Sequence, residues 1–582
     1  MNAPAVMDSE KTHKVEEGSD RPSDDGLHYG SYEEAPSFWD RLGVTPNSFK
    51  RRTLSDKHNQ LNQSMKGRHL HMIAIGGSIG AGLFVGSGRA LSRGGPAALL
   101  IGFGIIGVMI FNVVYALGEL ACMYPVSGGF YTYSTRFVDP SWGFAMGWNY
   151  VMQWAVVLPL ELVVAGLVMD YLETGAPTAA WITIFWVIII VISIFGVLGY
   201  AEEEFWVSLL KLITVVIFLF MGVIFVCGGG PSNGDFSTYQ GGKRWSNPGA
   251  FANGFLGVCR TFVTAAFSFS GTELVGLAAA ESKDPQKSLP GAIKQVFWRI
   301  TLFYILSLTF IGLLVDFDDP RLLGSGGGLI DTSASPFVIV AEKAGIPAFG
   351  TFVNVVIMFA VVSIGLSGVY GGSRTLTALA EQGYAPKVFT YIDRAGRPLW
   401  STIAILAFGP IAYVGLATSG ETVFNWLLSL SGLAALFTWG SICVAHIRFR
   451  SAWKMAGHTL DELPFKAAGG VYGSWLGFVL IVLVLIAQFY TALYSALPTK
   501  PAGEKYGGGG AGAEGFFLDY LAFPVVILFY IIGFVWKRKT WVPLAQIDVD
   551  GGRRELDLVE HERKRVRLAA MNPVRRFMDK IM

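Results

Sequence analysis

Long apolar runs separated by short polar segments fill the chain from position 69 to position 536. A helix needs about 20 consecutive apolar residues to cross the hydrocarbon core of a membrane. The pattern therefore predicts an all-α polytopic membrane protein with about twelve transmembrane helices. Their centres are expected near Ile79, Ile110, Ala155, Ile190, Val216, Ala266, Ser307, Ala360, Phe408, Leu433, Val484 and Leu528.

Glycine and hydroxyl residues interrupt two of these spans, the first and the sixth. The interruptions lie in IAIGGSIGAGLFVGSG (73–88) and FVTAAFSFSGTELVG (262–276). Unpaired backbone groups are costly in hydrocarbon, so a broken helix persists only where protein or a wet cavity covers the break. Two broken helices, one in each half, are typical of secondary transporters. The alternative is that the glycines only let helices pack closely.

The same two interruptions indicate an internal repeat. Gly80 and Gly271 lie 191 residues apart, which fits the separation of spans one and six if two five-helix units are inverted relative to one another. We expect the repeats over about 69–228 and 251–447 and two extra helices over about 474–536.

The first interruption is expected at mid-membrane. If the span enters near His69, Gly80 lies about halfway across, because a helix rises about 1.5 Å per residue. A helix that restarts near Gly82 presents free N–H groups and the positive end of its dipole to the break. Such a helix start suits a carboxylate.

The sixth span is expected to expose the opposite polarity. It breaks between Ser268 and Gly271, so the preceding half-helix ends with free carbonyls from Phe267 to Ser270. Carbonyls at the negative end of a helix dipole suit an ammonium group. The two interruptions together predict a site for a zwitterion such as an amino acid.

Four ionisable residues lie within the predicted spans, where a charge is expensive and a functional role is the default interpretation. Glu161 and Glu273 are predicted to be functional, because a buried carboxyl that changes its protonation can couple a site to a pH gradient. Lys211 is either functional or reaches the interface on its long stem. Glu119 lies near the end of its span, where a structural role is favoured.

Loop charge predicts the orientation of the chain. Alternate loops are rich in Lys and Arg, which marks the cytoplasmic side and places both termini there. Residues 1–68 are polar and predicted to be largely disordered. Residues 537–582 form a second tail, whose basic part from 553 onward either lies on anionic membrane lipids or is a solvated tail.

Several functional classes find no support in the sequence. No nucleophile with a base, phosphate loop or metal cluster is evident, so we expect no enzyme activity, no metal site and no cofactor. No nucleic-acid partner is expected. A channel would need a continuous polar lining or a charged ring, which is not seen. A receptor that binds amino acids and signals is kept as an alternative.

The membrane portion, from Arg68 through Trp541, closely resembles fungal amino acid permeases of the amino acid–polyamine–organocation superfamily, and most closely the general amino acid permeases. The motifs that carry the resemblance include RHLHMIAIGGSIGAGLFVGSG, ALGELACMYPVSGGFYTYSTRFVDP, MQWAVVLPLELV, AAFSFSGTELVGLAAAESKDPQKSLPGAIKQVFWRITLFYILSL and FNWLLSLSGLAALFTWGSICVAHIRFR. The resemblance implies a LeuT-like five-plus-five inverted repeat with two added C-terminal helices. It also implies proton-coupled amino acid uptake at the plasma membrane.

The resemblance assigns roles at the two interruptions. The substrate carboxylate is expected to meet the backbone around Ala81 and Gly82, and the amine to meet carbonyls of Ser78, Phe267 and Ser270. Phe267 is expected to close over the ligand. The full predicted substrate-binding set is Ser78, Gly80, Ala81, Gly82, Glu161, Phe267, Ser268, Ser270, Gly271 and Thr272.

Three further residues bear on this comparison. Lys211 resembles the fifth-span lysine that replaces a coupling ion in related carriers, and we assign proton coupling to Lys211 and Glu273. Glu161 resembles an acidic third-span position linked to substrate recognition. Ala81 departs from the Ser or Thr of many relatives, so one hydroxyl contact to the carboxylate is missing.

We therefore predict a proton-coupled symporter of broad amino acid specificity that works by alternating access. The alternative within this class is a narrower permease for basic amino acids or proline. The expected partners are amino acids, protons and membrane lipids. By resemblance, an arrestin-like adaptor and a ubiquitin ligase are expected to act on N-terminal lysines, of which the candidates are Lys11, Lys14, Lys50 and Lys57.

Overall fold

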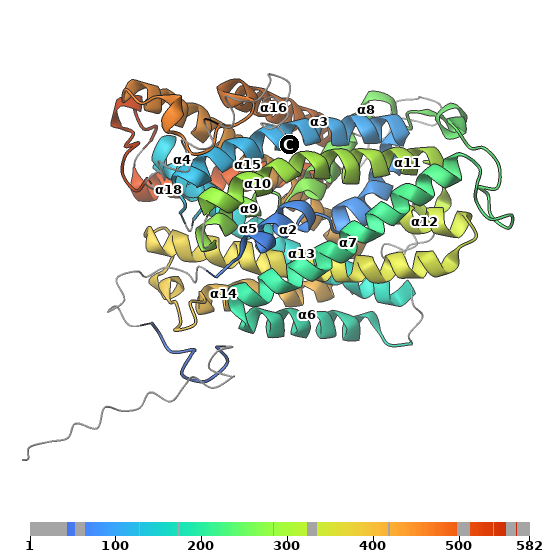
Figure 1. Cartoon of the computed structure of the whole chain (residues 1–582), viewed down its shortest axis with the longest axis horizontal. Coiled ribbons are helices and arrows are strands. Elements are labelled where there is room, and N and C mark those ends of the chain that lie inside the picture. The colour runs from blue at the N-terminus through green and yellow to red at the C-terminus, as the bar shows by residue number, and fades with distance from the viewer. Residues whose placement is uncertain are drawn as a thin grey trace, which may run out of the picture.

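The computed structural model describes residues 43–52, 64–126, 128–171, 175–282, 285–322, 335–416, 420–497, 512–538, 540–553 and 566. Over these residues the chain is helical and carries no strand, and its long helices run side by side (Figure 1). Nine helices in this part are long and apolar enough to cross a membrane, and the bent pair α17 and α18 makes a tenth. The predicted all-α membrane fold is confirmed.

The first half of the chain contains five predicted spans. Its helices are α2 (Gly67–Gly76), η1 (Gly82–Gly86), α3 (Ser87–Met123), α4 (Phe130–Phe137), α5 (Pro140–Tyr171), α6 (Thr178–Ile194) and α7 (Gly196–Val226). η1 and α3 form one continuous helix, Gly82–Met123, which contains the end of the first predicted span and the whole of the second. It bends at Gly95, whose φ of 82° is outside the helical region and favours glycine.

The second half repeats this order and adds two spans. Its main helices are α8 (Gly254–Phe269), α9 (Leu274–Ala278), η3 (Ala279–Glu281), α10 (Pro285–Trp298), η4 (Arg299–Leu306), α11 (Ser307–Leu314), α12 (Pro336–Lys343), α13 (Pro347–Glu381), α14 (Leu399–Leu406), η8 (Gly409–Leu416), α15 (Gly420–Met455), α16 (Gly470–Ala496), α17 (Gly512–Tyr520) and α18 (Ala522–Lys537). A broken helix opens each half, as expected of two five-helix units followed by two further helices.

The break in the first span lies where the sequence predicts it. α2 ends at Gly76 and η1 restarts at Gly82. The carbonyl of Gly80 accepts hydrogen bonds from the N–H groups of Leu83 and Phe84, both at 3.1 Å. The amides that open the new helix have no acceptor within it, as at any helix start. The positive end of η1 therefore faces the break.

The break in the sixth span lies two residues later than predicted. α8 ends at Phe269 and α9 begins at Leu274, so the break covers 270–273 rather than 268–271. Gly271 has a φ of 91°, a left-handed conformation that glycine adopts without a steric penalty. The chain turns at this glycine, and α8 continues two residues further than the sequence predicts, through Ser268 and Phe269.

The two broken helices approach each other very closely. A Cβ atom added at Gly82 would lie 2.4 Å from Cα of Ser268, which is backbone and cannot move aside. A Cβ atom added at Gly80 would lie 2.5 Å from Cγ1 of Ile364, which is a side-chain atom. Gly82 therefore serves close packing, the alternative interpretation of these glycines. A larger side chain there would collide with α8 rather than enter a ligand site.

The segment 43–52 is packed against the rest of the protein, although the sequence predicts disorder for residues 1–68. Tyr391 donates a hydrogen bond to the carbonyl of Phe49 at 2.8 Å, and the guanidinium of Arg397 lies 4.3 Å from the centre of the Phe49 ring. The disorder prediction is wrong for this segment. The prediction rests on overall composition, which does not show that one aromatic side chain, Phe49, packs against the rest of the protein. The rest of the predicted tail below position 64 lies outside the described residues.

The first part of the C-terminal tail is also packed rather than free. It runs beside α4 and the end of α15, where Ile547 and Val549 are buried. Arg136 donates hydrogen bonds to the carbonyls of Asp548 at 2.8 Å and Gly551 at 2.7 Å. Tyr124 donates to the carbonyl of Val549 at 2.5 Å. These contacts fasten the segment to the helices that it follows.

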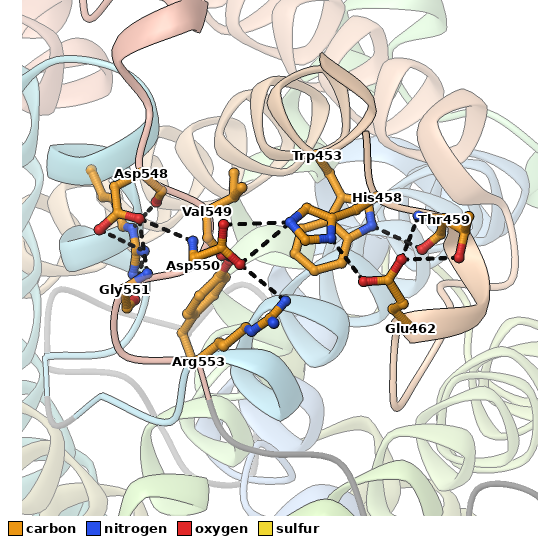
Figure 2. A network of polar contacts seen from close by, with 11 residues as sticks. Trp453, His458, Thr459, Glu462, Asp548, Val549, Asp550, Gly551 and Arg553 are labelled. Carbon is orange, nitrogen blue, oxygen red and sulfur yellow. Dashed lines mark hydrogen bonds and ion pairs between the residues drawn. The ribbon is translucent and has the colours of Figure 1, made fainter. Parts of the chain in front are cut away.

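A polar network joins this segment to the turn after α15 (Figure 2). His458 contacts Glu462 at 2.8 Å and Asp550 at 3.3 Å. Backbone hydrogen bonds from Gly551 and Asp550 lower the pKa of Asp548, and a backbone hydrogen bond from Thr459 lowers that of Glu462. Because both pKa values are lowered, the stabilisation is complete above the ordinary carboxyl range and is lost as pH falls from that range through the lowered pKa values.

The close approach at Gly82 gives a testable difference between two glycines. Gly82→Ala should destabilise the protein by about 1–3 kcal/mol through overpacking against backbone. Gly80→Ala should cost clearly less, because the Ile364 side chain can rotate away. Thermal unfolding of the two purified variants in detergent measures the difference. Equal midpoints for the two variants would contradict the packing described here.

The docked C-terminal segment gives a second prediction. Arg136→Ala should reduce the hydrogen-exchange protection of 542–553 by about 10-fold or more, because it removes two hydrogen bonds from a charged donor. Arg553→Ala is the matched control, since its pair with Asp550 is exposed and such pairs contribute about 0–1 kcal/mol. Wild-type protection should persist from pH 7 to pH 5 and fall below about pH 4. Unchanged protection in Arg136→Ala would disprove the docking contacts.

Candidate functional site

A small cavity of about 10 Å³, room for about one water molecule, lies between the two broken helices. Residues from α5 and α13 close its sides. Seven of the predicted binding residues line it, namely Ser78, Gly80, Ala81, Gly82, Glu161, Phe267 and Ser270. The remaining lining comes from Trp154, Val157 and Ile364, which the sequence analysis did not single out. Residues of both interruptions therefore meet at one cavity.

Three predicted binding residues do not line this cavity. The hydroxyl of Ser268 donates to the carbonyl of Thr264 at 2.7 Å, so it is used within α8. The hydroxyl of Thr272 donates to the carbonyl of Phe269 at 2.6 Å. The N–H of Gly271 donates to the carboxylate of Glu273 at 3.3 Å. The contacts of Gly271 and Thr272 therefore stabilise the break, whereas that of Ser268 lies within α8, which extends two residues further than the sequence predicts.

The carbonyls at the end of α8 are partly satisfied, contrary to the expectation that they are free. The carbonyl of Phe267 accepts from the N–H of Ser270 at 3.1 Å, and that of Ser268 accepts from the hydroxyl of Tyr304 at 2.7 Å. A carbonyl oxygen has two lone pairs, so each can accept a second donor. The negative end of α8 still faces the cavity that the start of η1 also faces.

Tyr304 on η4 fastens the two interruptions together and was missed by the sequence analysis. Its hydroxyl lies 3.0 Å from the carbonyl of Ser78 and 2.7 Å from the carbonyl of Ser268. It also lies 3.3 Å from the hydroxyl of Ser78. A tyrosine hydroxyl inside the predicted seventh span was the available signal. Nothing in the sequence indicates which carbonyls it would reach.

Arg299, at the start of η4, is a second missed residue. It is fully buried, and its guanidinium donates to the carbonyl of Ala74 at 2.6 Å and to the hydroxyl of Thr272 at 2.5 Å. Ala74 lies in the last turn of α2, where a positive charge interacts favourably with the helix dipole. One cation thus links the end of α2 to the break in the sixth span.

Glu161 lies on α5 two residues after Pro159 and is 1% exposed. Among the described residues, neither of its carboxylate oxygens has a hydrogen-bond partner. An unpaired buried carboxylate is costly. Because Glu161 lines the cavity, a ligand that brings a proton or a hydrogen-bond donor would remove this cost.

Lys211 and Glu273, the two predicted coupling residues, lie behind the cavity lining. Lys211 is fully buried, with its ammonium 3.4 Å from the carbonyl of Gly76, so the interpretation that it reaches the interface is wrong. Glu273 precedes α9 and accepts hydrogen bonds from the N–H of Gly271 at 3.3 Å and the indole of Trp439 at 3.1 Å. Each residue is thus attached to one of the two interruptions.

Glu119 has the structural surroundings that the sequence favours. Its carboxylate contacts His446 at 3.0 Å and Arg450 at 2.5 Å, and it accepts the N–H of Ala467 at 2.7 Å. These contacts join α3 to α15 and to the turn that follows α15. All of its neighbours belong to this joint, which lies outside the cavity lining.

Known proteins resemble this chain over most of its length. The sequence profile of a family described as amino acid permease matches residues 69–545. The amino-acid permease inda1 of Hypocrea atroviridis is 60% identical over 94% of this chain and 94% of its own length. The general amino-acid permease GAP1 of Saccharomyces cerevisiae is 52% identical over 86% of this chain and 81% of its own length.

More distant proteins were also found. The cationic amino acid transporter 1 of Schizosaccharomyces pombe is 46% identical over 86% of this chain and 85% of its own length. A solved structure of MHP1, a nucleobase-cation-symport-1 family transporter with bound bromovinylhydantoin, is 14% identical, with a TM-score of 0.43 over 85% of this chain and 95% of that chain. The family profile covers residues 69–545, and these fungal relatives each match 86% or more of the chain. The chain is a multi-pass membrane protein that belongs to the amino acid permease family.

Proposed function

We propose that the protein is a proton-coupled amino acid symporter of broad specificity that works by alternating access at the plasma membrane, and that it has no enzyme activity. The observation that supports this most is the cavity where the start of η1 and the end of α8 meet. Opposite helix ends offer a positive and a negative partial charge to the two ends of one amino acid. Transporters of this kind place their substrate between broken helices at mid-membrane.

Proton coupling is assigned to Lys211 and Glu273. Lys211 contacts the last residue of α2, and Glu273 contacts the break between α8 and α9. A change in the protonation of either residue alters its attraction for the backbone that forms the cavity. The transported proton serves as the coupling ion, and no cofactor takes part in this scheme.

A narrower preference for basic amino acids is the second candidate. Glu161 presents a carboxylate without a partner among the described residues to the cavity, and a cationic side chain would pair with it. A relative named cationic amino acid transporter 1 is 46% identical to this chain. A competition experiment with many amino acids separates this candidate from broad specificity.

Regulation by an adaptor and a ubiquitin ligase is part of the proposal. Of the four candidate lysines, Lys50 is exposed on the docked segment 43–52. Lys11, Lys14 and Lys57 lie outside the described residues. The proposed orientation places these lysines in the cytoplasm, with the basic loops.

Uptake of labelled leucine into cells that express the chain tests this function. We expect accumulation against a gradient that is several-fold greater at external pH 5 than at pH 7 and that a protonophore abolishes. Competition by all twenty amino acids should be broad, whereas inhibition confined to lysine, arginine and histidine would favour the second candidate. Leucine binding without net flux would identify a receptor instead. Uptake that is independent of pH and of the protonophore would refute proton coupling.

A further inference from the structure

Two adjacent carboxylates on α7, those of the partly exposed Glu203 and the buried Glu204, form an acidic cluster that the proposed site does not use. We call these two residues the α7 acid pair. Glu204 is fully buried, and its carboxylate accepts hydrogen bonds from Ser208 at 2.6 Å and from Ser363 at 2.7 Å. Ser363 belongs to α13, so the cluster lies where α7 packs against α13. Neither glutamate was singled out by the sequence, because they stand at the polar start of an apolar run.

Lys211 connects this cluster to the first interruption. Its ammonium lies 3.7 Å from Glu204 and 3.4 Å from the carbonyl of Gly76, where α2 ends. Glu204 precedes Lys211 by two helical turns on the same face of α7. The α2 and α7 helices touch at this level, since a Cβ atom at Gly76 would lie 2.0 Å from the Ser208 hydroxyl. A proton on Lys211 is therefore next to both the end of α2 and the α7 acid pair.

Ser363 bridges the two carboxylates of the pair. Its hydroxyl lies 2.7 Å from the carboxylate of Glu204 and 3.4 Å from that of Glu203. A serine hydroxyl donates and accepts hydrogen bonds, so it can pass a proton from one carboxyl to the other. Glu203 is partly exposed, whereas Glu204 is fully buried. The preceding residue, Glu202, has a side chain that is 43% exposed and lies at the same end of the helix bundle, where α7 begins.

The charges around the cluster favour the uptake of one proton. Lys211 is the one cation at ion-pair distance from Glu204 among the described residues, so two carboxylates face a single ammonium. With all three groups ionised, the cluster carries one net negative charge in a medium of low dielectric constant. One added proton makes the cluster neutral, which removes the electrostatic cost.

Neighbouring charged groups have partners of their own. On α2, Arg68 pairs with Glu202 at 2.5 Å, and His69 contacts the same carboxylate at 3.1 Å. On α13, Arg374 pairs with Glu281 at 3.0 Å. Glu161, on α5, lies on the cavity side and carries no positive charge. These groups therefore supply no positive charge that would replace the missing proton of the α7 acid pair.

We propose that Glu204, Ser363 and Glu203 form a proton relay from Lys211 to the side of the membrane where α7 begins, which loop charge predicts to be cytoplasmic. This inference rests on the proposed proton coupling and names the residues that would carry the proton out. The Lys211 ammonium transfers a proton to the Glu204 carboxylate, leaving a neutral amine and a carboxylic acid. Ser363 passes a proton to Glu203 as it takes the one from Glu204, and Glu203 releases it to water.

The first proton transfer, from Lys211 to Glu204, requires a movement of the Lys211 side chain. The separation of 3.7 Å between Lys211 and Glu204 exceeds the range of about 2.6–3.2 Å in which proton transfer occurs. The separation of 3.4 Å between Ser363 and Glu203 also exceeds this range, so the Glu203 side chain must move closer for the last transfer. The ammonium of Lys211 must leave the carbonyl of Gly76 and approach Glu204 by about 0.5–1 Å. Release of the proton is thereby tied to the position of the end of α2, which leads into the first interruption and its cavity-lining residues. After release, the neutral amine takes its next proton from the cavity side.

Purified protein in liposomes tests the relay, with two readouts on the same preparation. The first is exchange of labelled leucine for internal leucine, which requires no net proton movement. The second is leucine accumulation driven by an imposed pH gradient, followed with an internal pH dye. Ser363→Ala and Glu204→Gln should keep exchange within about 2-fold and lower gradient-driven accumulation and proton entry by about 10-fold or more.

Ser367→Ala is the matched control. Ser367 also lies on α13, with its hydroxyl 3.4 Å from Glu204, but its other contact is Tyr200 at 3.3 Å rather than Glu203. It should behave as wild type in both readouts. Normal gradient-driven accumulation in Ser363→Ala and Glu204→Gln, with a proton-coupled wild type, would overturn the relay alone, as would a loss confined to Ser367→Ala. A wild-type protein that exchanges leucine but ignores the pH gradient would overturn the proposed proton coupling itself.

Discussion

The fold depends on covering backbone groups that two broken helices leave unpaired inside the membrane. Such groups cost several kcal/mol in hydrocarbon, so every break needs partners from elsewhere in the chain. Tyr304 and Arg299, both on η4, supply many of them by reaching carbonyls or hydroxyls at both interruptions. The cavity lies where the backbone groups of the two breaks are not covered by other parts of the protein. Its lining therefore combines polar chain ends that the protein itself only partly satisfies with the side chains of Trp154, Val157 and Ile364.

The same contacts connect the cavity to the charges behind it. Glu273 holds the sixth-span break and reaches Trp439 on α15, whereas Lys211 holds the end of α2 and reaches the α7 acid pair. A ligand that draws the two interruptions together changes the positions of both attachments. Coupling between substrate and proton then needs no direct contact between them, since both act on the same two broken helices.

The sequence predicted the features that are determined within a single segment, namely the spans and their interruptions. Apolar run length placed the spans, and glycine clusters placed both interruptions, the first at its observed position and the second two residues early. It could not predict partners from distant elements, such as Tyr304 for the carbonyls or Ser363 for the α7 acid pair. Those pairings depend on helix rotation and register, which periodicity within a single helix does not fix.

The central claim is that opposite helix ends bind the two charges of one zwitterion, and analogues of leucine test it most directly. Binding to purified protein in detergent should weaken by about 10–100-fold for leucinamide, which lacks the carboxylate, and similarly for N-acetyl-leucine, which lacks the ammonium, because each loses a charged hydrogen bond. If either analogue binds as tightly as leucine, the corresponding helix end does not hold the substrate, and the account is contradicted.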